Sequence, residues 1–240
     1  MILAAGFGKR LRPLTDILPK PLLEVGGRPL IDYGLLLLKK YGITEVWINL
    51  HHHGDRIVQA VGDGSRLGMR IQYSEEPEIL GTGGGIKKMA ADLGAESFIV
   101  LNGDIVVEVD LDQVLAFHRD KKAAATLVLR QAEDPAQYGV IEIDRTDRIR
   151  NILDRTPWEG KEKRRLMFTG VHILEPRVLD YIPSGRFYSI VDAYIEMLRN
   201  KNNLYGYLNE GYWNDLGEID RYQWVNREIK AGKLKLSHVP

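Results

Sequence analysis

The sequence predicts an α/β protein whose mostly parallel, mixed sheet is flanked by helices. The main evidence is that short apolar or β-branched runs alternate with segments of helical spacing over the first half of the chain. This alternation indicates βαβ units and a sheet covered on both faces. The 240 residues are 44% hydrophobic, which is enough to form a buried core. No proline- or serine-rich linker, internal repeat or low-complexity tract divides the chain.

The first half supplies the expected parallel strands and the helices that connect them. Met1–Ala5 is an apolar run typical of a buried strand, and Gly42 follows a segment of helical spacing as its stop signal. Strands are expected at 1–5, 43–50, 69–74 and 97–104, and helices at 30–41, 53–61, 86–93 (after a glycine loop that starts at residue 81) and 111–123.

In the second half, closely spaced short strands replace the regular strand–helix alternation, and this predicts a mixed-sheet lobe beside a cleft. Residues 138–154 predict two strands around a polar turn at 145–147, and residues 203–216 predict short aromatic strands. A strand at 166–174 and helices at 189–201 and 220–232 complete this half. We therefore expect a single domain over residues 1–240, with halves of about 1–110 and about 111–240.

Charge and composition exclude several classes of protein. Lys plus Arg and Asp plus Glu each number 33, and the net charge of +0 argues against a dedicated nucleic-acid binder. The count of 0 cysteines excludes disulfides, thiolate metal sites and a cysteine nucleophile, and it favours a cytoplasmic location. No apolar run approaches the ~20 residues needed to cross a bilayer, and the first residues do not resemble a signal peptide, so we expect no membrane partner.

The opening stretch MILAAGFGKRLRPLTDILPKP places glycines and cations directly after the first strand. Gly6 and Gly8 permit positive φ and close approach of backbone N–H groups to a ligand, which makes this turn a candidate anion site. The cations that would neutralise a polyphosphate there are Lys9, Arg10, Arg12 and Lys20. The spacing matches neither a GxGxxG dinucleotide fingerprint nor a Walker A loop. On the glycines and cations alone, a strand-to-helix turn with solvated cations is an equal alternative.

A longer, ordered pattern runs through the same stretch: Leu3-Ala4-Ala5-Gly6-x-Gly8-x-Arg10-Leu11-x-Pro13-Leu14-Thr15, then Pro19-Lys20-Pro21. This pattern resembles the signature of the sugar-1-phosphate nucleotidyltransferases, also called NDP-sugar pyrophosphorylases. The resemblance implies the Rossmann-like nucleotide-diphospho-sugar transferase fold, with a nucleotide-binding half and a smaller sugar-binding lobe. It implies nucleotide binding by Leu3, Ala4, Ala5, Gly6 and Gly8, and catalytic roles for Arg10 and Lys20.

Two carboxylates that lie far apart in the sequence are expected to hold a metal ion. Asp104 ends an apolar strand, and a carboxylate at that edge of a parallel sheet points into the ligand crevice. Alone, its NGD motif is more often a strand-end turn, and YWNDLG at 212–217 is more often a core aromatic before a turn. In the family that the chain resembles, similar segments carry metal-binding aspartates. The resemblance therefore implies that Asp104 and Asp215 bind Mg²⁺, the cofactor that we expect.

The resemblance also implies where the base and the sugar phosphate bind. In the family, the segment equivalent to LGTGGG packs against the nucleobase, which implies nucleotide contacts from Gly81, Thr82 and Gly83, with Glu75 upstream influencing the choice of base. The expected sugar-phosphate residues are Asn102, Gly139, Asp154, Arg155 and Thr169. Many family members carry Glu-Lys-Pro where this chain has Asp154-Arg155-Thr156-Pro157, and this departure leaves the identity of the sugar open.

The resemblance implies the reaction NTP + sugar 1-phosphate → NDP-sugar + pyrophosphate, with those two substrates as the partners. The LGTGGG and GYWNDLG segments resemble most those of family members that use GTP with a mannose- or heptose-type sugar 1-phosphate, followed by members that use UTP with N-acetylmuramate 1-phosphate. One alternative is a cytidylyltransferase for a phospho-alcohol such as phosphocholine. The other is a non-catalytic regulatory subunit with the same fold. The nucleobase, the sugar, the pathway and assembly into a homo-oligomer stay open.

Overall fold

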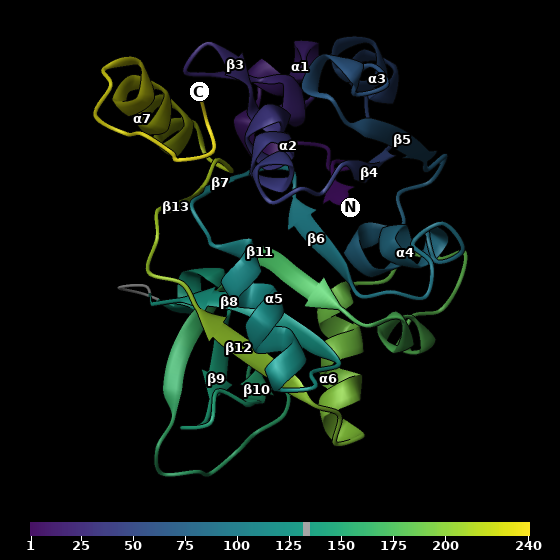
Figure 1. The fold of residues 1–240 in the computed structure, drawn as a ribbon, viewed down its shortest axis with the longest axis vertical. Helices are drawn as coiled ribbons and strands as arrows, with labels where there is room; N and C mark the ends of the chain where they lie inside the picture. The colour runs from purple at the N-terminus through teal and green to yellow at the C-terminus, as the bar shows by residue number, and fades with distance from the viewer. Residues whose placement is uncertain (132–134) are drawn as a thin grey trace. The chain divides into compact units, whose positions relative to one another are not determined.

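The computed structural model describes residues 1–131 and 135–240, and its contacts divide the chain into two compact units. The first unit consists of Met1–Ile79, Leu101–Val109 and Gly211–Pro240, and the second of Leu80–Val100 and Asp110–Glu210. Nine strands belong to a mixed sheet, and helices accompany the strands of both units (Figure 1). The predicted α/β class with a mixed, helix-flanked sheet is confirmed.

The first unit is built around parallel strands in the order β6-β1-β4-β5. Because β4 and β5 lie on one side of β1 and the later strand β6 on the other, the direction of winding reverses between β1 and β6. In an open parallel sheet, ligands bind outside the carboxyl ends of the strands at such a point. The strands that carry this unit are β1 (Ile2–Leu3), β2 (Glu24–Val25), β3 (Arg28–Pro29), β4 (Glu45–Leu50), β5 (Arg70–Glu75), β6 (Phe98–Asn102, shared with the second unit), β7 (Ile105–Val107) and β13 (Trp213–Asp215).

Its helices follow the predicted apolar spacing. α2 buries its leucine face and ends where expected, since Gly42 at φ 73° donates its N–H to the carbonyl of Lys39 at 3.0 Å. Arg66 binds the buried carboxylate of Asp32 on α2 through both terminal nitrogens, at 2.5 and 3.1 Å. The helical segments are α1 (Leu14–Ile17), α2 (Leu30–Lys40), α3 (Gly54–Val61) and α7 (Ile219–Lys230), with short 3-10 turns at Lys9–Leu11, Lys20–Leu22 and Ser65–Leu67.

A short antiparallel pair, β7 with β13, joins segments of the first unit that are distant in sequence. Trp213 lies opposite Val107, and Asp215 lies opposite Ile105. The pair is anchored by an apolar cluster made of Val25, Leu30, Tyr33, Val106, Leu216, Val225 and Leu236. The last helix and the C-terminal segment therefore hold the Asp215 segment against the strand that follows Asp104.

The second unit holds antiparallel strands in the order β10-β9-β11-β8, with β12 parallel to β8. The two strands predicted within residues 138–154 and the polar turn between them are present. Its elements are α4 (Gly81–Lys88), α5 (Leu111–Asp120), β8 (Ala125–Arg130), a 3-10 turn at Pro135–Tyr138, β9 (Val140–Ile143), β10 (Ile149–Ile152), β11 (Arg164–Leu174), a 3-10 turn at Pro176–Tyr181, α6 (Ile190–Arg199) and β12 (Leu204–Leu208). Within the described residues, the helices are too short or too polar to span a bilayer.

The prediction for the glycine segment was wrong in its boundaries. We expected a loop from residue 81 and a helix at 86–93, but α4 begins at Gly81 and ends at Lys88. The glycines form the first turns of the helix because the backbone of a neighbouring segment packs directly on them, as described below.

Candidate functional site

The loop after β1 is closed on itself by its own threonine. Gly8 has φ 64°, and a Cβ at this position would lie 2.8 Å from Cγ2 of Thr15. The hydroxyl of Thr15 in turn donates a hydrogen bond to the carbonyl of Gly8 at 2.9 Å. These contacts explain why the pattern requires both residues, since together they fix the curvature of the loop.

The loop borders a cavity of about 260 Å³ in the first unit. Residues 6–11, Lys20, Asp104 and Gly217 line it. A Cβ built on Gly6 would meet no atom within 4 Å, so no described residue beyond its chain neighbours covers this part of the backbone. A ligand can therefore approach the backbone closely at Gly6, as an anion-binding loop requires.

The pairing of β7 with β13 brings the two predicted carboxylates to this cavity. The N–H of Leu216 donates to the carbonyl of Asp104 at 3.1 Å, which fixes Asp215 beside the start of β7. Gly103 is required by packing, because a Cβ there would lie 2.7 Å from the carbonyl oxygen of Leu3. The NGD motif thus places its aspartate next to the loop that follows β1.

Lys20 lies between the two carboxylates and is itself buried. Its Nζ is 2.7 Å from Oδ2 of Asp104 and 3.7 Å from Oδ1 of Asp215. The structure therefore brings together the predicted catalytic lysine and both predicted metal ligands. A single ammonium group offsets part of the repulsion between two carboxylates that ionise close together.

Asp215 is the more constrained of the two carboxylates. Burial, and then the charge of Asp104, raise its pKa above the usual value, while Lys20 and Arg10 act in the opposite direction. Its Oδ1 is buried and has no hydrogen-bond partner. A Cβ on Gly217 would lie 2.8 Å from this oxygen and 2.6 Å from Nη2 of Arg10, so the glycine leaves room for the predicted catalytic arginine.

The unpartnered oxygen of Asp215 and the adjacent carboxylate of Asp104 fit a hard divalent cation. Magnesium prefers oxygen ligands and is usually held by one or two carboxylates together with water and phosphate oxygens. No group of three or more His, Cys, Asp or Glu residues suited to a metal occurs in the part of the chain that the structure describes. A cation at this pair would therefore take its other ligands from water and from a bound phosphate.

A buried polar network beside the loop was not predicted from the sequence. Asn49, at 2% exposure, accepts a hydrogen bond from the N–H of Ala4 at 2.8 Å and donates to Oε1 of the buried Glu76 at 2.7 Å. His51 places Nδ1 2.7 Å from the carbonyl of Glu76, and its ring contacts Phe7 edge-on at 5.0 Å. The available signal was a lone asparagine inside the apolar strand EVWINL.

The predicted base-contacting residues lie in two different environments. Glu75 is exposed at the end of β5, whereas the glycines of α4 are largely occupied by contacts within the second unit. The N–H groups of Gly83 and Gly84 both donate to the carbonyl of Tyr188, at 2.9 and 3.2 Å. A Cβ on Gly84 would lie 2.7 Å from the carbonyl oxygen of Arg186, so the glycines serve close packing of two backbones.

Thr82 and the expected sugar-phosphate residues are distributed over several elements. The hydroxyl of Thr82 accepts from the N–H of Ile190 at 3.0 Å, and Asn102 ends β6 opposite Leu3. Thr169 is buried in β11, where its hydroxyl donates to the carbonyl of Val128 at 2.7 Å. The hydroxyl of Thr169 is thus engaged with a neighbouring strand.

Gly139, Asp154 and Arg155 lie near the ends of β9 and β10. A Cβ on Gly139, which has φ 85°, would lie 2.4 Å from Cδ2 of Leu153. Arg155 forms an ion pair with Asp192 at 2.6 Å. The structure brings Gly139 close to Leu153, the residue before Asp154.

The chain is similar to known proteins over most of its length. A family model described as "Nucleotidyl transferase" matches residues 1–232. The chain is 35% identical over 234 residues to a mannose-1-phosphate guanylyltransferase of Mycobacterium tuberculosis, covering 97% of this chain and 64% of that protein. It is 36% identical over 224 residues to an N-acetylmuramate α-1-phosphate uridylyltransferase of Neisseria meningitidis, covering 92% of this chain and 94% of that protein.

A solved structure shows the same fold. A Bacillus anthracis chain described as a glucose-1-phosphate thymidylyltransferase superposes with a TM-score of 0.83 at 27% identity, covering 95% of this chain and 94% of that one. The curated relatives are not all of one length. The chain spans 64% of the mycobacterial protein and 65% of a Synechocystis UTP–glucose-1-phosphate uridylyltransferase that is 31% identical to it.

Proposed function

Because the chain belongs to the nucleotidyl transferase family, we propose that it transfers a nucleoside monophosphate from an NTP to a sugar 1-phosphate and releases pyrophosphate. The observation that carries this proposal is Lys20 placed between Asp104 and Asp215, on a cavity bordered by the glycine loop. The cavity lies where β1 and β6 end, at the point of the sheet where ligands of α/β proteins bind.

The proposed reaction is an in-line displacement at the α-phosphorus of the NTP. A phosphate oxygen of the sugar 1-phosphate forms the new P–O bond, and the bond to the β-phosphate oxygen breaks with its electron pair leaving on pyrophosphate. The nucleophile is already ionised at neutral pH, so positioning and charge neutralisation supply the catalysis. We assign the leaving pyrophosphate to Arg10 and the loop amides, and the charge at the reacting phosphates to Lys20.

Asp104 and Asp215 are the residues that would hold Mg²⁺. When bound, the ion would supply charge neutralisation at phosphate oxygens. The support is that Oδ1 of Asp215 is buried with no hydrogen-bond partner among the described residues, and that burial and the charge of Asp104 raise the pKa of this carboxyl group. Lys20 would remain beside both carboxylates and limit the repulsion between them.

For the substrates, we propose GTP with a mannose- or heptose-type sugar 1-phosphate first, and UTP with N-acetylmuramate 1-phosphate second. The names of the relatives, which include guanylyl- and uridylyltransferases, support this order. Leu3, Ala4, Ala5, Gly6 and Gly8 would contact the nucleotide, with Glu75 and the Gly81–Gly83 segment at the base. Asn102, Gly139, Asp154, Arg155 and Thr169 remain the candidates for the sugar-phosphate side. The relatives give no support to the phospho-alcohol and non-catalytic alternatives.

The test is a pyrophosphate-release screen with Mg²⁺ that crosses GTP, UTP, CTP, dTTP and ATP with a panel of sugar 1-phosphates. We expect release with one preferred pair, and loss of that release in Asp104→Asn and Asp215→Asn proteins that keep the wild-type circular dichroism spectrum. Phosphocholine with CTP is included as the rival acceptor. Absence of release with every pair, or wild-type turnover in both aspartate variants, would refute the proposal.

A further inference from the structure

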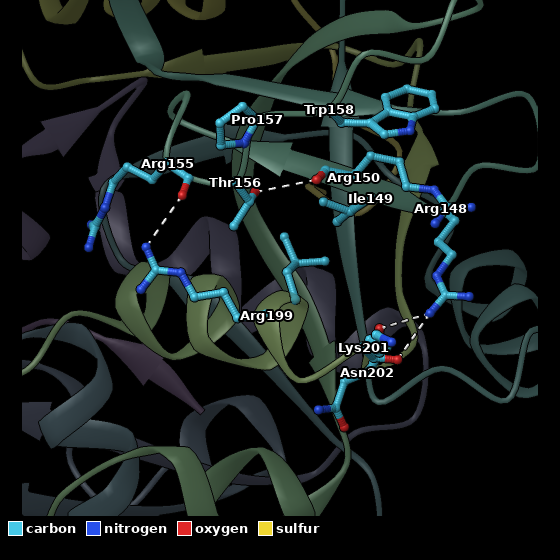
Figure 2. Close-up of a pocket in the computed structure, with 11 residues that line it drawn as sticks. Arg148, Ile149, Arg150, Arg155, Thr156, Pro157, Trp158, Arg199, Lys201 and Asn202 are labelled. Atoms are coloured by element: carbon cyan, nitrogen blue, oxygen red, sulfur yellow. Dashed lines mark hydrogen bonds between the residues drawn. The ribbon is translucent and has the colours of Figure 1, made fainter.

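The second unit contains a larger cavity, of about 620 Å³, whose charged lining is entirely basic. It is lined by the start of β10, the 155–158 loop and the end of α6, and no aspartate or glutamate lines it. The guanidinium groups on it belong to Arg148, Arg150, Arg155 and Arg199 (Figure 2). A volume in the range of about 300–1,000 Å³ is typical of small-molecule sites and far exceeds what a bare inorganic anion needs.

Two of these arginines have carboxylate partners outside the lining. Nε of Arg150 is 2.7 Å from Oδ2 of Asp144, and Nη1 of Arg155 is 2.6 Å from Oδ1 of Asp192. These ion pairs offset part of the positive charge and fix the directions of both side chains.

The guanidinium groups of the other two arginines donate hydrogen bonds only to carbonyl oxygens of the described residues. Nη2 of Arg148 donates to the carbonyls of Lys201 and Asn202 at 3.1 and 3.3 Å. Nη2 of Arg199 donates to the carbonyl of Arg155 at 3.4 Å. No carboxylate lies within ion-pair distance of either group in the described part of the chain. Each guanidinium keeps further N–H donors, which suit the oxygens of a phosphate.

The arginines are distributed around an apolar middle. Figure 2 shows Arg155 and Arg199 on one side and Arg148 on the opposite side, with Ile149 and Thr156 between them. Pro157, Trp158 and Leu198 add further apolar surface to the lining. A ligand that fills this space therefore needs a body of some size as well as an anionic group.

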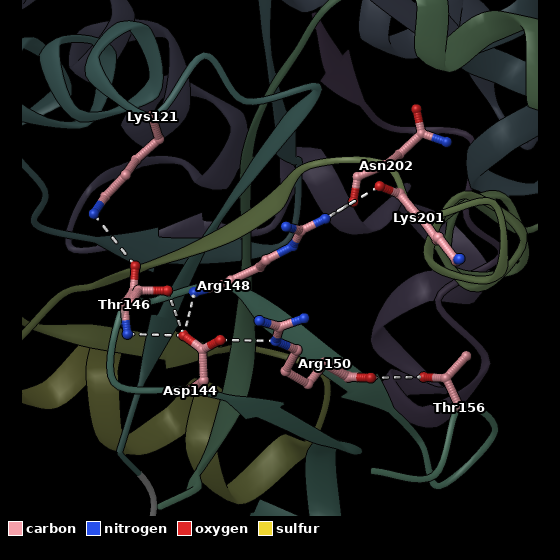
Figure 3. A network of polar contacts seen from close by, with 8 residues as sticks. All are labelled: Lys121, Asp144, Thr146, Arg148, Arg150, Thr156, Lys201 and Asn202. Atoms are coloured by element: carbon pink, nitrogen blue, oxygen red, sulfur yellow. Dashed lines mark hydrogen bonds and ion pairs between the residues drawn. The ribbon is translucent and has the colours of Figure 1, made fainter. Parts of the chain in front are cut away.

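The carboxylate of Asp144 holds the segment that carries Arg148 and Arg150 in place through hydrogen bonds. Asp144 accepts from the backbone N–H and hydroxyl of Thr146, from the N–H of Arg148 at 3.2 Å and from Nε of Arg150 (Figure 3). The hydroxyl of Thr156 donates to the carbonyl of Arg150 at 3.3 Å, which ties the 155–158 loop to β10. Arg150 on β10 and Arg148 just before it are therefore pre-positioned before any ligand binds.

We propose that this cavity is a second anion site, which binds a phosphorylated metabolite with a body the size of a sugar or a nucleoside. Phosphate fits better than a carboxylate because a phosphate monoester carries up to two negative charges and offers oxygens to more than one guanidinium. The cavity shares no residue with the one around Lys20. It contains Arg155, which is also a candidate for the sugar-phosphate side of the proposed reaction, so the test below uses Arg199, which has no part in that proposal.

The test is calorimetric titration with glucose 6-phosphate and, separately, with adenosine 5′-monophosphate. Glucose 6-phosphate has a free C1 hydroxyl, so it is not an acceptor in the proposed reaction. We expect one of these two compounds to bind with one site per chain. The compound that binds more tightly shows whether the cavity prefers a phosphate attached to a sugar or to a nucleoside. Because Arg199 is exposed and makes only one long hydrogen bond, Arg199→Ala should fold normally.

Arg199→Ala should weaken binding by about tenfold or more, and Arg199→Lys by less, because the charge is kept and the planar fork is lost. Arg70→Ala is the matched control, since Arg70 is an exposed arginine paired with Glu45 in the first unit. Lys20→Ala should leave this affinity unchanged. The proposal would be overturned if neither glucose 6-phosphate nor adenosine 5′-monophosphate bound at concentrations up to about 10 mM. It would also be overturned if Arg70→Ala weakened binding as much as Arg199→Ala, or if Lys20→Ala weakened it.

Discussion

Lys20 is the residue on which the candidate site depends most. It is buried, and it contacts Asp104 at 2.7 Å and Asp215 at 3.7 Å. In Lys20→Ala, two carboxylates would face one another without a cation, and the phosphates would lose a positive partner. We expect turnover in the pyrophosphate-release assay to fall by about a hundredfold or more. Lys39→Ala, which removes an exposed lysine from α2, should keep wild-type turnover, and equal losses in the two variants would count against a specific role for Lys20.

Asp144 is the residue with the clearest pH dependence. Burial alone would raise its pKa, but hydrogen bonds from Thr146, Arg150 and the backbone outweigh burial and lower the pKa to about 2 (Figure 3). A pKa that is depressed in the folded state adds stability above the unfolded value of 3.8, and this stability is lost as pH falls towards 2. Asp144→Asn should therefore lower the free energy of unfolding by about 2 kcal/mol at neutral pH.

The measurement for Asp144 is urea unfolding of both proteins between pH 7 and pH 3. The stability difference between wild type and Asp144→Asn should stay constant down to about pH 4 and shrink below it. A difference that does not change with pH would mean that the carboxylate charge is not what stabilises this turn.

At the scale of elements, the pair β7–β13 and the segment after it position the acidic side of the site. Gly217 allows Arg10 and Asp215 to lie together, because a Cβ there would be 2.6 Å from Nη2 of Arg10 and 2.8 Å from Oδ1 of Asp215. The end of an exposed arginine moves easily, so Gly217→Ala should leave the melting temperature almost unchanged. Turnover should fall by about tenfold or more, because both groups are displaced.

The matched control for Gly217→Ala is Gly34→Ala in α2. A Cβ on Gly34 would lie 3.4 Å from Cδ1 of Ile2, an ordinary contact, and alanine is favoured over glycine inside a helix. Gly34→Ala should keep full turnover with equal or slightly higher stability. Unchanged turnover in Gly217→Ala would show that Arg10 and Asp215 do not need this arrangement.

Elements with strong local patterns were predictable, and elements defined by distant contacts were not. The strands at β4 and β5 and the helices α2 and α6 follow directly from apolar periodicity. The short aromatic strands predicted within residues 203–216 include β13, but β7, which is only three residues long, was not predicted. The pairing of β7 with β13 was not predicted either, because it depends on the apolar cluster around Val106 and Leu216. The approach of Asp104 to Asp215 therefore followed from the family resemblance and not from spacing.

Within the site, the sequence indicated chemistry better than it indicated packing. Gly6 and Lys20 were candidates for anion binding from their residue types, whereas the metal-binding role of Asp104 was implied by the family resemblance. The role of Asn49 was missed because its partners, Ala4 and Glu76, come together only when β1, β4 and β5 are adjacent. The glycines of α4 were expected to serve ligand approach, and only the structure shows that they also allow the backbone of residues 186–188 to pack on them.

For the whole molecule, the central question is whether the metal supports the fold or only the reaction. Lys20 already offsets the charge of both carboxylates without a metal, and the last helix and the C-terminal segment anchor the β7–β13 pair through apolar contacts. We therefore expect EDTA to abolish pyrophosphate release while changing the melting temperature of the free protein by less than about 2 °C.

Addition of Mg²⁺ with the preferred NTP should restore activity and stabilise the fold. A ligand at a hundred times its dissociation constant adds about 2.7 kcal/mol, which corresponds to roughly 5–10 °C in a chain of this length. The same addition to Asp215→Asn should produce a much smaller shift, because that variant loses the carboxylate whose buried Oδ1 has no hydrogen-bond partner among the described residues. If EDTA alone lowered the melting temperature by as much as the nucleotide raises it, the cation would be part of the fold, and Lys20 would not suffice to hold the two aspartates together.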